Sequence, residues 1–364
     1  MSNNPPFSFN FNGLLKCTFA LTMRCNLACD YCYIDKSDSV MSLSTAERII
    51  QFIFDNARPS DTLDIGFFGG EPLLEFGLLK RIVELIMDHG SFNPEKARLS
   101  VTSNGTILND EIVKYLSEKQ ISLCVSCDGP PAAQDRFRHF PNGEGTSTIV
   151  EKNLKRALEA MPFTSVNAVY SPETLRFLPE TVSYFLSLGL RKIYLSPNIS
   201  ARWTQKEAAL LSSVYSAVAE QYINANNSGR SAFISLIDSK ISLLTQGGYK
   251  PAERCKMGKG EYAFGPSGNV YPCERLIGFD DGKTHCLGNI HSELSSNKMC
   301  QGVSSTSTNS ECAECTLKDY CMNWCGCTNY YSTGRYSTVS AFTCSSEKAA
   351  IKTALDVIQK TQES

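Results

Sequence analysis

Short apolar runs alternate with longer amphipathic segments between residues 14 and 200. The runs are rich in β-branched and aromatic residues and predict strands near 14–22, 63–68, 97–103, 121–126, 162–170 and 190–196. The periodicity between them predicts helices near 44–57, 72–89, 109–119, 147–160 and 173–188. Ser44 and Glu47 predict a capping box for the first helix. Six β/α units predict an α/β fold, a partial and open (β/α)6 version of the TIM-like barrel, with site residues at the C-terminal ends of the strands.

The rest of the chain divides into helical and cysteine-rich parts. Two helical stretches are expected near 204–227 and 233–246, and a final helix near 346–361. Between them lies a cysteine-rich segment with turn signals and little periodicity, as in small metal-stapled folds. The predicted organisation is a tail at 1–13, a barrel at 14–200, a helical connection at 201–250, a cysteine-rich domain at 251–345 and a C-terminal helix at 346–364.

Composition and charge exclude several partners. The 364 residues are 42% hydrophobic and 20% charged, which is ordinary for a globular protein, and the net charge of −2 offers no footprint for nucleic acid or an anionic membrane. No apolar run has transmembrane length, and the polar N-terminus with its two prolines is not a signal peptide. We therefore expect a cytoplasmic protein with neither nucleic acid nor a membrane as partner.

Cysteine is the compositional outlier. Of sixteen cysteines, ten lie between Cys255 and Cys344, and none lies between Ala133 and Arg254. In a chain of this size without a signal sequence, metal binding explains them better than disulfides.

Three cysteines follow the first predicted strand at close spacing. Cys25, Cys29 and Cys32 fall on the loop that leaves this strand, and such a loop can fold three thiolates around one face of a cubane iron–sulfur cluster. One iron then has no protein ligand, which is typical of a catalytic metal site. The alternatives are a zinc knuckle with a fourth ligand from elsewhere, or buried apolar cysteines.

The motif Cys25-x3-Cys29-x2-Cys32, with Tyr31 before the last cysteine, resembles the signature of the radical S-adenosylmethionine (radical SAM) enzymes. The resemblance implies a [4Fe–4S] cluster whose open iron is chelated by SAM. It implies that one electron from the cluster, supplied by a donor such as flavodoxin or ferredoxin, cleaves SAM to a 5′-deoxyadenosyl radical that abstracts hydrogen from a substrate. It also implies the partial barrel predicted from the β/α pattern.

The end of the second predicted strand reads Gly69-Gly70-Glu71-Pro72. Two glycines after a strand allow a close approach to the backbone, and a carboxylate beside them can bind an ammonium group. The alternative is an ordinary strand-to-helix turn with Pro72 at the first helical position. The stretch resembles the Gly-Gly-Glu motif of radical SAM enzymes, and this resemblance implies that Gly69, Gly70 and Glu71 receive the amino group of SAM.

Two further strand ends resemble SAM-binding motifs. Ser103 and Asn104 stand in a Ser-Asn-Gly sequence that lines the SAM site in the family. Ser126 and Asp128 belong to a Ser-x-Asp-Gly-Pro sequence, which implies that Ser126 lies near the SAM ribose and that Asp128 is structural. Gln134 stands where relatives often have histidine.

The C-terminal cysteines resemble the seven-cysteine SPASM domain, which carries two auxiliary [4Fe–4S] clusters. The resemblance assigns Cys255, Cys273 and Cys325 to the first cluster, and Cys312, Cys315, Cys321 and Cys344 to the second. The first cluster is then one ligand short, so that Cys286, Cys300 or Cys327 completes it or the position is open to substrate. For the second group a zinc ribbon is the alternative.

These resemblances imply a radical SAM/SPASM enzyme that oxidatively modifies a peptide or protein. The first hypothesis is maturation of a ribosomally made peptide through a thioether or carbon–carbon crosslink. The second is an anaerobic sulfatase-maturing enzyme, which forms formylglycine from cysteine or serine. An electron-transfer or zinc-scaffold protein is a third class, but it would have no use for the Gly-Gly-Glu motif. Since no leader-binding domain of common size fits before Leu14, a separate partner would bind the leader of a peptide substrate.

One acidic residue bears on this choice. Glu274 directly follows Cys273, where sulfatase-maturing enzymes carry an acidic residue that acts as base. We expect partial desolvation to raise the pKa of Glu274 towards neutrality, as a general base requires. The alternative is a surface ion pair between Glu274 and Arg275 or a nearby lysine.

Overall fold

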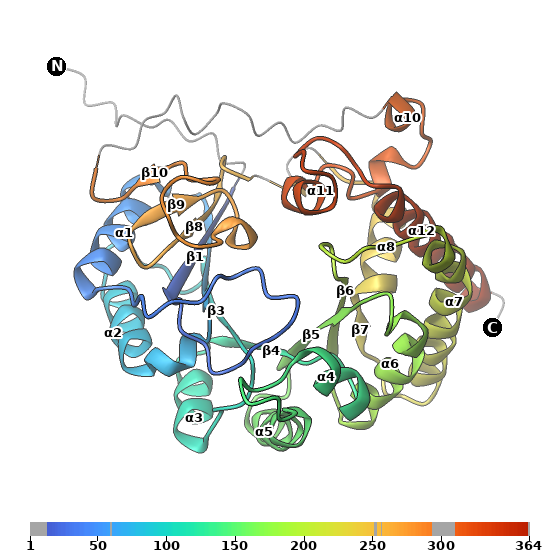
Figure 1. The fold of residues 1–364 in the computed structure, drawn as a ribbon, viewed down its shortest axis with the longest axis horizontal. Coiled ribbons are helices and arrows are strands. Elements are labelled where there is room, and N and C mark those ends of the chain that lie inside the picture. The colour runs from blue at the N-terminus through green and yellow to red at the C-terminus, as the bar shows by residue number, and fades with distance from the viewer. Residues whose placement is uncertain (1–12, 59, 251–252, 256, 293–309, 363–364) are drawn as a thin grey trace. The chain divides into compact units, whose positions relative to one another are not determined.

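The computed structural model describes residues 13–58, 60–250, 253–255, 257–292 and 310–362 (Figure 1). The predicted tail therefore falls almost entirely outside the described residues. The chain forms two compact units. Unit 1 comprises Met1–Ala28, Cys32–Leu123 and Lys256–Val303, and unit 2 comprises Cys29–Tyr31, Cys124–Cys255 and Ser304–Ser364.

Unit 1 contains a sheet with the strand order β10-β9-β8-β1-β2-β3. The strands are β1 (Leu14–Thr22), β2 (Thr62–Gly69), β3 (Ala97–Ser103), β8 (Glu261–Phe264), β9 (Asn269–Tyr271) and β10 (Gly288–Asn289). β1 runs parallel to β2 and β8, and β2 runs parallel to β3, whereas β8, β9 and β10 pair antiparallel. Burial alternates strictly along β2, as expected for a strand with one face in the core.

Helices α1 (Leu43–Asn56), α2 (Phe76–Met87) and α3 (Asp110–Glu118) belong to unit 1, and a 3₁₀ turn η1 (Pro72–Glu75) precedes α2. In α1, Ala46, Ile49, Ile50 and Ile53 are buried, which is the spacing of one helix face. The predicted cap is wrong by two residues, because the N-cap is Ser42 and not Ser44: the side chain of Ser42 accepts the N–H of Thr45 at 3.0 Å. Ser42 is the better cap because it has the extended backbone that an N-cap requires.

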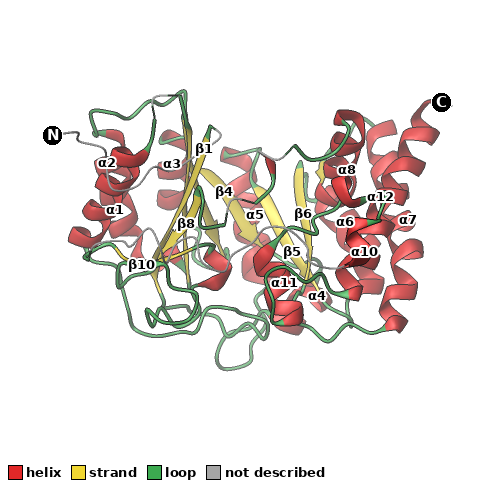
Figure 2. Cartoon of the chain, turned by 90° about the horizontal axis from the view of Figure 1, so that it is seen from above, coloured by secondary structure: helices red, strands yellow, loops and turns green. Residues whose placement is uncertain are grey.

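Unit 2 contains the parallel strands β4 (Ser122–Ser126), β5 (Ser165–Tyr170), β6 (Lys192–Pro197) and β7 (Phe233–Ile234) in sequential order. Its helices are α4 (Pro131–Phe137), α5 (Ser147–Ala160), α6 (Leu178–Ser187), α7 (Gln205–Asn227), α8 (Ser235–Gln246), α10 (Ser310–Ala313), α11 (Gly326–Thr333) and α12 (Ala341–Gln362), with 3₁₀ turns η2 (Leu175–Phe177) and η5 (Lys318–Tyr320). The long helix α12 packs against α7 and α8 (Figures 1 and 2).

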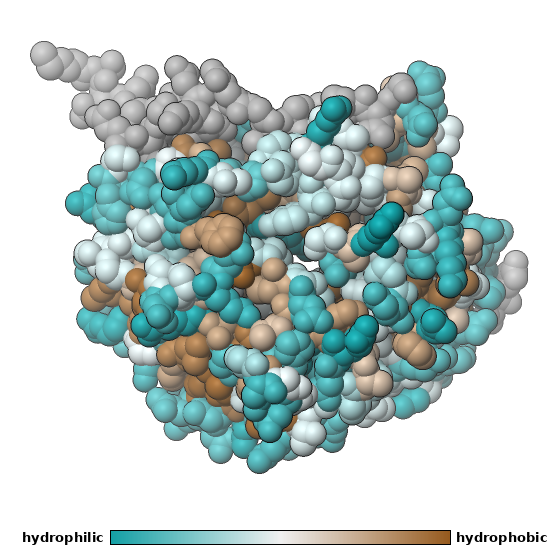
Figure 3. Space-filling view, in the orientation of Figure 1, coloured by the Kyte–Doolittle hydropathy of each residue, from teal (hydrophilic) through white to brown (hydrophobic). Residues whose placement is uncertain are grey.

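The β/α repeat confirms the predicted α/β class. All six strands expected before residue 200 are present in the predicted places. The short strands β7, β8, β9 and β10 and the short helices α4, α10 and α11 were not predicted, and β7 begins the segment that the pattern predicted as helix. Hydrophilic side chains cover much of the periphery of the face in Figure 3, as expected where helices turn their apolar sides inwards. Among the described residues, no helix combines the length and apolar character needed to cross a membrane.

Candidate SAM and iron–sulfur sites

The turn after β2 lies directly against the start of the cysteine loop. The N–H of Gly70 donates to the carbonyl of Thr22 at 2.8 Å, and the N–H of Glu71 donates to the carbonyl of Arg24 at 2.8 Å. A Cβ on Gly70 would lie 2.0 Å from the carbonyl oxygen of Arg24, and Gly69 has a φ of +134°. Only glycine fits at both positions, because the two backbone segments touch. The glycines thus permit a close approach of the chain to itself.

Glu71 is completely buried and uses its carboxylate within the protein. It accepts hydrogen bonds from the N–H of Leu73 at 3.1 Å, the hydroxyl of Ser103 at 2.9 Å and the N–H of Asn104 at 2.7 Å. Burial raises the pKa of Glu71 to about 7, although these three hydrogen bonds act to lower it. The carboxylate therefore ties the end of β2 to the end of β3, and it also caps η1, in which Pro72 is the first residue.

Asn104 connects this corner to the first cysteine of the motif. Its side-chain N–H group donates to the sulfur of Cys25 at 3.8 Å and to the side-chain oxygen of Asn26 at 2.8 Å. The N–H of Leu27 also donates to the sulfur of Cys25, at 3.5 Å. Donors at a sulfur favour the thiolate, which is the form that binds iron. The chemistry around Cys25 therefore fits an iron–sulfur ligand, and unit 1 brings together Cys25, Glu71, Ser103 and Asn104.

Of the other two cysteines of the motif, Cys32 belongs to unit 1 and Cys29 to unit 2. Hydrogen bonds within unit 2 fix the residue next to Cys29. The N–H of Asp30 donates to the carbonyl of Phe137 at 3.0 Å, and the carboxylate of Asp30 lies 2.9 Å from the ring nitrogen Nε2 of His139. The loop is therefore held by partners more than a hundred residues away in the chain.

Asp128 forms the centre of a buried polar network in unit 2, and Tyr31 is one of its partners. The hydroxyl of Tyr31 donates to Asp128, whose carboxylate lies 3.1 Å from Nε of Arg138 and accepts the N–H of Val169 at 2.9 Å. The guanidinium of Arg138 lies 5.1 Å from the centroid of the Tyr31 ring. Burial raises the pKa of Tyr31, so the hydroxyl keeps its proton and acts as donor. These contacts of Asp128 are all within the protein, as expected for a residue with a structural role.

Gln134 and Ser126 lie beside this network. The side-chain oxygen of Gln134 accepts the N–H of Asp128 at 2.8 Å, and its amide donates to the hydroxyl of Thr146 at 3.0 Å. Gln134 is completely buried, so its position is a packing position. Ser126 is the last residue of β4 and pairs with Asn167 of β5 in a parallel register.

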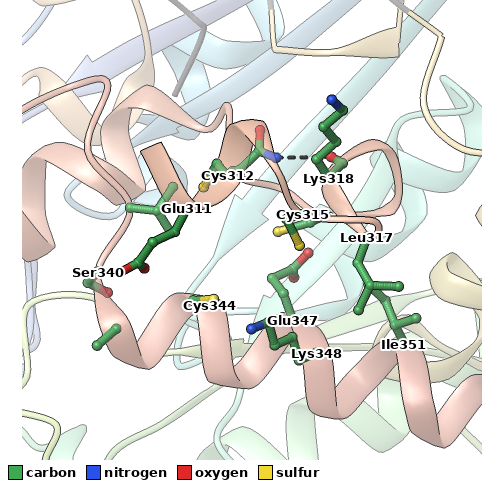
Figure 4. Close-up of a pocket in the computed structure, with 14 residues that line it drawn as sticks. Glu311, Cys312, Cys315, Leu317, Lys318, Ser340, Cys344, Glu347, Lys348 and Ile351 are labelled. Atoms are coloured by element: carbon green, nitrogen blue, oxygen red, sulfur yellow. Dashed lines mark hydrogen bonds between the residues drawn. The ribbon is translucent and has the colours of Figure 1, made fainter. Parts of the chain in front are cut away.

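The four cysteines predicted for the second auxiliary cluster line one cavity of unit 2, with a volume of about 220 Å³ (Figure 4). They come from α10, the following turn, the end of η5 and α12, and are Cys312, Cys315, Cys321 and Cys344. Burial raises the pKa of the Cys344 thiol. Four thiols around one small cavity fit a [4Fe–4S] cluster, and the same donor set also fits zinc.

Of the residues predicted for the first auxiliary cluster, Cys255 and Cys325 belong to unit 2. The sulfur of Cys325 lies 3.7 Å from the sulfur of Cys327. This proximity favours Cys327 among the three candidates for the missing ligand. Cys286 directs its thiol to a backbone carbonyl at 3.1 Å, and Cys300 lies outside the described residues.

Glu274 begins a 3₁₀ turn, η4 (Glu274–Leu276), directly after the buried Cys273 in unit 1. Its carboxylate lies 3.7 Å from Nζ of Lys16, which also pairs with Glu261 at 2.8 Å. Burial acts to raise the pKa of Glu274, but Lys16 and Arg275 outweigh it, so the pKa is lowered. The predicted rise of this pKa is therefore wrong. The pair with Lys16 is also partly buried, with the Glu274 side chain 23% exposed, rather than a surface contact.

Residues 19–185 match the Radical SAM superfamily. They form a radical SAM domain. The chain that carries this domain is an enzyme, as predicted. A radical SAM domain binds a [4Fe–4S] cluster and S-adenosylmethionine, and the two N–H groups that donate to the sulfur of Cys25 fit an iron–sulfur ligand at that position.

The similarity of this chain to known proteins extends beyond the radical SAM domain. A cysteine-type anaerobic sulfatase-maturating enzyme of Clostridium novyi is 25% identical over 332 residues, which cover 83% of this chain and 85% of that protein. Native anSMEcpe, solved with bound AdoMet and the Cp18Cys peptide, superposes with a TM-score of 0.76 at 19% identity and covers 96% of this chain and 99% of its own. Streptococcus suis SuiB, bound to the precursor peptide SuiA, gives a TM-score of 0.63 at 16% identity, over 92% of this chain and 77% of its own. The predicted fold, an α/β partial barrel with a cysteine-rich C-terminal region, is confirmed.

Proposed function

We propose that this chain is a radical SAM/SPASM enzyme that oxidatively modifies a peptide or protein. The observation that carries the proposal is the cavity lined by Cys312, Cys315, Cys321 and Cys344, on a chain that also has a radical SAM domain. Hydrogen abstraction leaves one electron on the substrate that must be removed if the substrate is to be oxidised. An auxiliary cluster supplies a one-electron acceptor when it is bound.

The cofactor residues in this proposal are those that the sequence motifs imply. Cys25, Cys29 and Cys32 would hold the cluster that cleaves SAM, and two auxiliary clusters bring the total to three [4Fe–4S] clusters. The residues that would contact SAM are Gly69, Gly70, Glu71, Ser103, Asn104 and Ser126. The hydrogen-bonded corner around Glu71 supports this set, because it fixes two strand ends beside Cys25. A flavodoxin or ferredoxin would supply the electron.

A peptide substrate is supported by the structural neighbours, since anSMEcpe and SuiB were both solved with peptides. Our first candidate is maturation of a ribosomally made peptide by a thioether or carbon–carbon crosslink, with a separate partner that binds the leader. The second candidate is formylglycine formation. It is favoured by the sulfatase-maturating relatives and by Glu274, which would accept the proton released when a C–H or S–H bond is oxidised.

The two candidates differ in their products. Anaerobically reconstituted enzyme would be incubated with SAM and dithionite, together with either a cysteine- or serine-containing sulfatase peptide or short cysteine-rich peptides encoded near its gene. A crosslinked peptide loses two hydrogens and forms no carbonyl, whereas formylglycine is an aldehyde that a hydrazine traps. Mass spectrometry therefore separates the candidates. Production of 5′-deoxyadenosine with no modification of any peptide or protein in a lysate of the host would overturn the proposal.

A further inference from the structure

A buried ion pair borders the four-cysteine cavity. Nζ of Lys240, on α8, lies 2.7 Å from Oε2 of Glu347, on α12, and the two side chains are only 6% and 15% exposed. Glu347 lines the cavity itself, and Figure 4 shows its carboxylate directed towards the cysteines. All of these residues belong to unit 2.

The pair also fixes the backbone on both sides of Cys321. Lys240 donates to the carbonyl of Tyr320 at 3.0 Å, and Glu347 accepts the N–H of Met322 at 2.6 Å. The residue before this predicted ligand is thus bound by Lys240, and the residue after it is bound by Glu347. A ligand held in this way has little freedom to turn away from the cavity.

The charged side chains around the cavity differ in how far they are exposed to solvent. Three other charged side chains that line it, Glu311, Lys318 and Lys348, are exposed, so water and salt screen them. Lys240 and Glu347 are screened far less. Burying both ions costs desolvation energy, and removing one of them leaves an uncompensated buried charge. A hydrophobic pair would avoid that desolvation but could not bind the Tyr320 carbonyl or the Met322 N–H beside Cys321.

We propose that the charge balance of the Lys240–Glu347 pair holds the reduction potential of the iron–sulfur cluster bound by these four cysteines in place, because either charge alone would displace it. The inference rests on the proposed function, which places a cluster in this cavity. Reduction adds one electron to a site that already contains four thiolates. The Lys240 cation stabilises the reduced form, the Glu347 anion opposes it, and the pair balances the two effects. Lys240 and Glu347 are positioning residues. They hold the backbone on either side of Cys321, and their charges affect the cluster without binding it.

Three variants separate charge from packing. Lys240→Met leaves Glu347 as an unpaired anion and is expected to lower the reduction potential of the cluster. Glu347→Gln leaves Lys240 as an unpaired cation and is expected to raise the potential. The double variant is neutral, so its potential returns towards that of the parent. If Lys240 served only to hold the Tyr320 carbonyl, the shift caused by Lys240→Met would persist in the double variant.

The measurement is a dithionite titration followed by electron paramagnetic resonance, with iron content determined for each variant. The relevant signal is the one that disappears in the double variant Cys312→Ala and Cys344→Ala. Lys352→Met, which removes an exposed cation from the same helix, is the matched control and should leave the potential unchanged. Shifts of the same sign in both single variants, or no shift in either, would overturn the inference. Should Lys240→Met not fold, the upward shift in Glu347→Gln decides alone.

Iron content distinguishes a failure of this inference from a failure of the proposed function. If Cys312→Ala and Cys344→Ala together remove no iron, the cavity holds no cluster and the proposed function loses its main support. If they remove iron but the potential does not respond to Lys240 and Glu347, only the inference about the pair is wrong.

Discussion

The Glu71 corner of unit 1 and the four-cysteine cavity of unit 2 are built in different ways. At Glu71, the protein supplies every partner itself, because hydrogen bonds from two strand ends converge on one buried carboxylate. At the cavity, thiols from short segments face one another, and the only long element among them is α12. The first region is organised by the sheet, whereas the second depends on side chains, above all the Lys240–Glu347 pair. Changes at the two regions should therefore have different consequences.

The largest effect is expected from Gly70→Ala. The added methyl group would lie 2.0 Å from the carbonyl oxygen of Arg24, which is backbone and cannot move aside without displacing the cysteine loop. We expect loss of about four irons from reconstituted protein and no 5′-deoxyadenosine, measured by iron analysis and chromatography.

Gly77→Ala is the matched control for Gly70→Ala. Gly77 lies in α2, and a Cβ there would meet nothing within 4 Å. Alanine should stabilise this helix by about 0.5–1 kcal/mol and leave the iron content unchanged. Equal iron contents in the two variants would show that the contact with Arg24 is not required.

Glu274→Gln tests the proton acceptor of the proposed reaction. Loss of a general base typically slows a reaction by about 10²–10⁴, so modified peptide should form more slowly by that factor while 5′-deoxyadenosine production continues. Since Lys16 and Arg275 lower the pKa of Glu274, the carboxylate is ionised at neutral pH, and product formation should fall only on acidification through that lowered pKa. Parallel measurement of both products at several pH values checks this. Unchanged rates of both would leave Glu274 as an ion-pair partner of Lys16.

Glu71→Gln should weaken SAM binding by about one to two orders of magnitude, because a charge-assisted hydrogen bond contributes roughly 1.5–3 kcal/mol. Equilibrium binding of SAM to the reconstituted protein measures the loss. Glu84→Gln, an exposed carboxylate on α2, is the control and should bind SAM like the parent. Parent-like affinity in Glu71→Gln would restrict Glu71 to its internal hydrogen bonds.

Glu71 should also have a smaller effect, on how the stability of the protein depends on pH. Burial raises the pKa of Glu71 from 4.5 to about 7, so the folded state holds this proton more tightly than the unfolded state. The contribution of Glu71 to the free energy of unfolding is therefore greatest below pH 4.5 and declines as the pH rises to about 7. Melting temperatures of the parent should fall relative to those of Glu71→Gln over that interval. A constant difference between the two proteins would contradict the raised pKa.

The sequence predicted what depends on local periodicity. The six strands before residue 200 and the helices between them follow from alternating and amphipathic patterns, and their bounds agree within a few residues. The strands β7, β8, β9 and β10 were missed because four or fewer residues carry too little pattern. The cap of α1 was misplaced because two serines, Ser42 and Ser44, compete for the role, and only backbone geometry decides between them.

Long-range partners could not be predicted. Tyr31 and Asp128 are 97 residues apart, and no local signal indicates that they meet. The direction of the pKa shift at Glu274 was wrong for the same reason, since its partner Lys16 lies on the first strand. The cysteine sets, by contrast, were predicted from their spacing and from the resemblance to known motifs, because ligand type and spacing are local properties of the sequence.

We propose that Cys25, Cys29 and Cys32 hold the cluster that cleaves SAM. The most direct measurement compares the triple variant, with all three changed to alanine, with Cys124→Ala, which alters a cysteine of β4 outside the predicted ligand sets. We expect the triple variant to lose about four irons and to produce no 5′-deoxyadenosine, whereas Cys124→Ala should retain both. Production of 5′-deoxyadenosine by the triple variant at the parental rate would contradict the account.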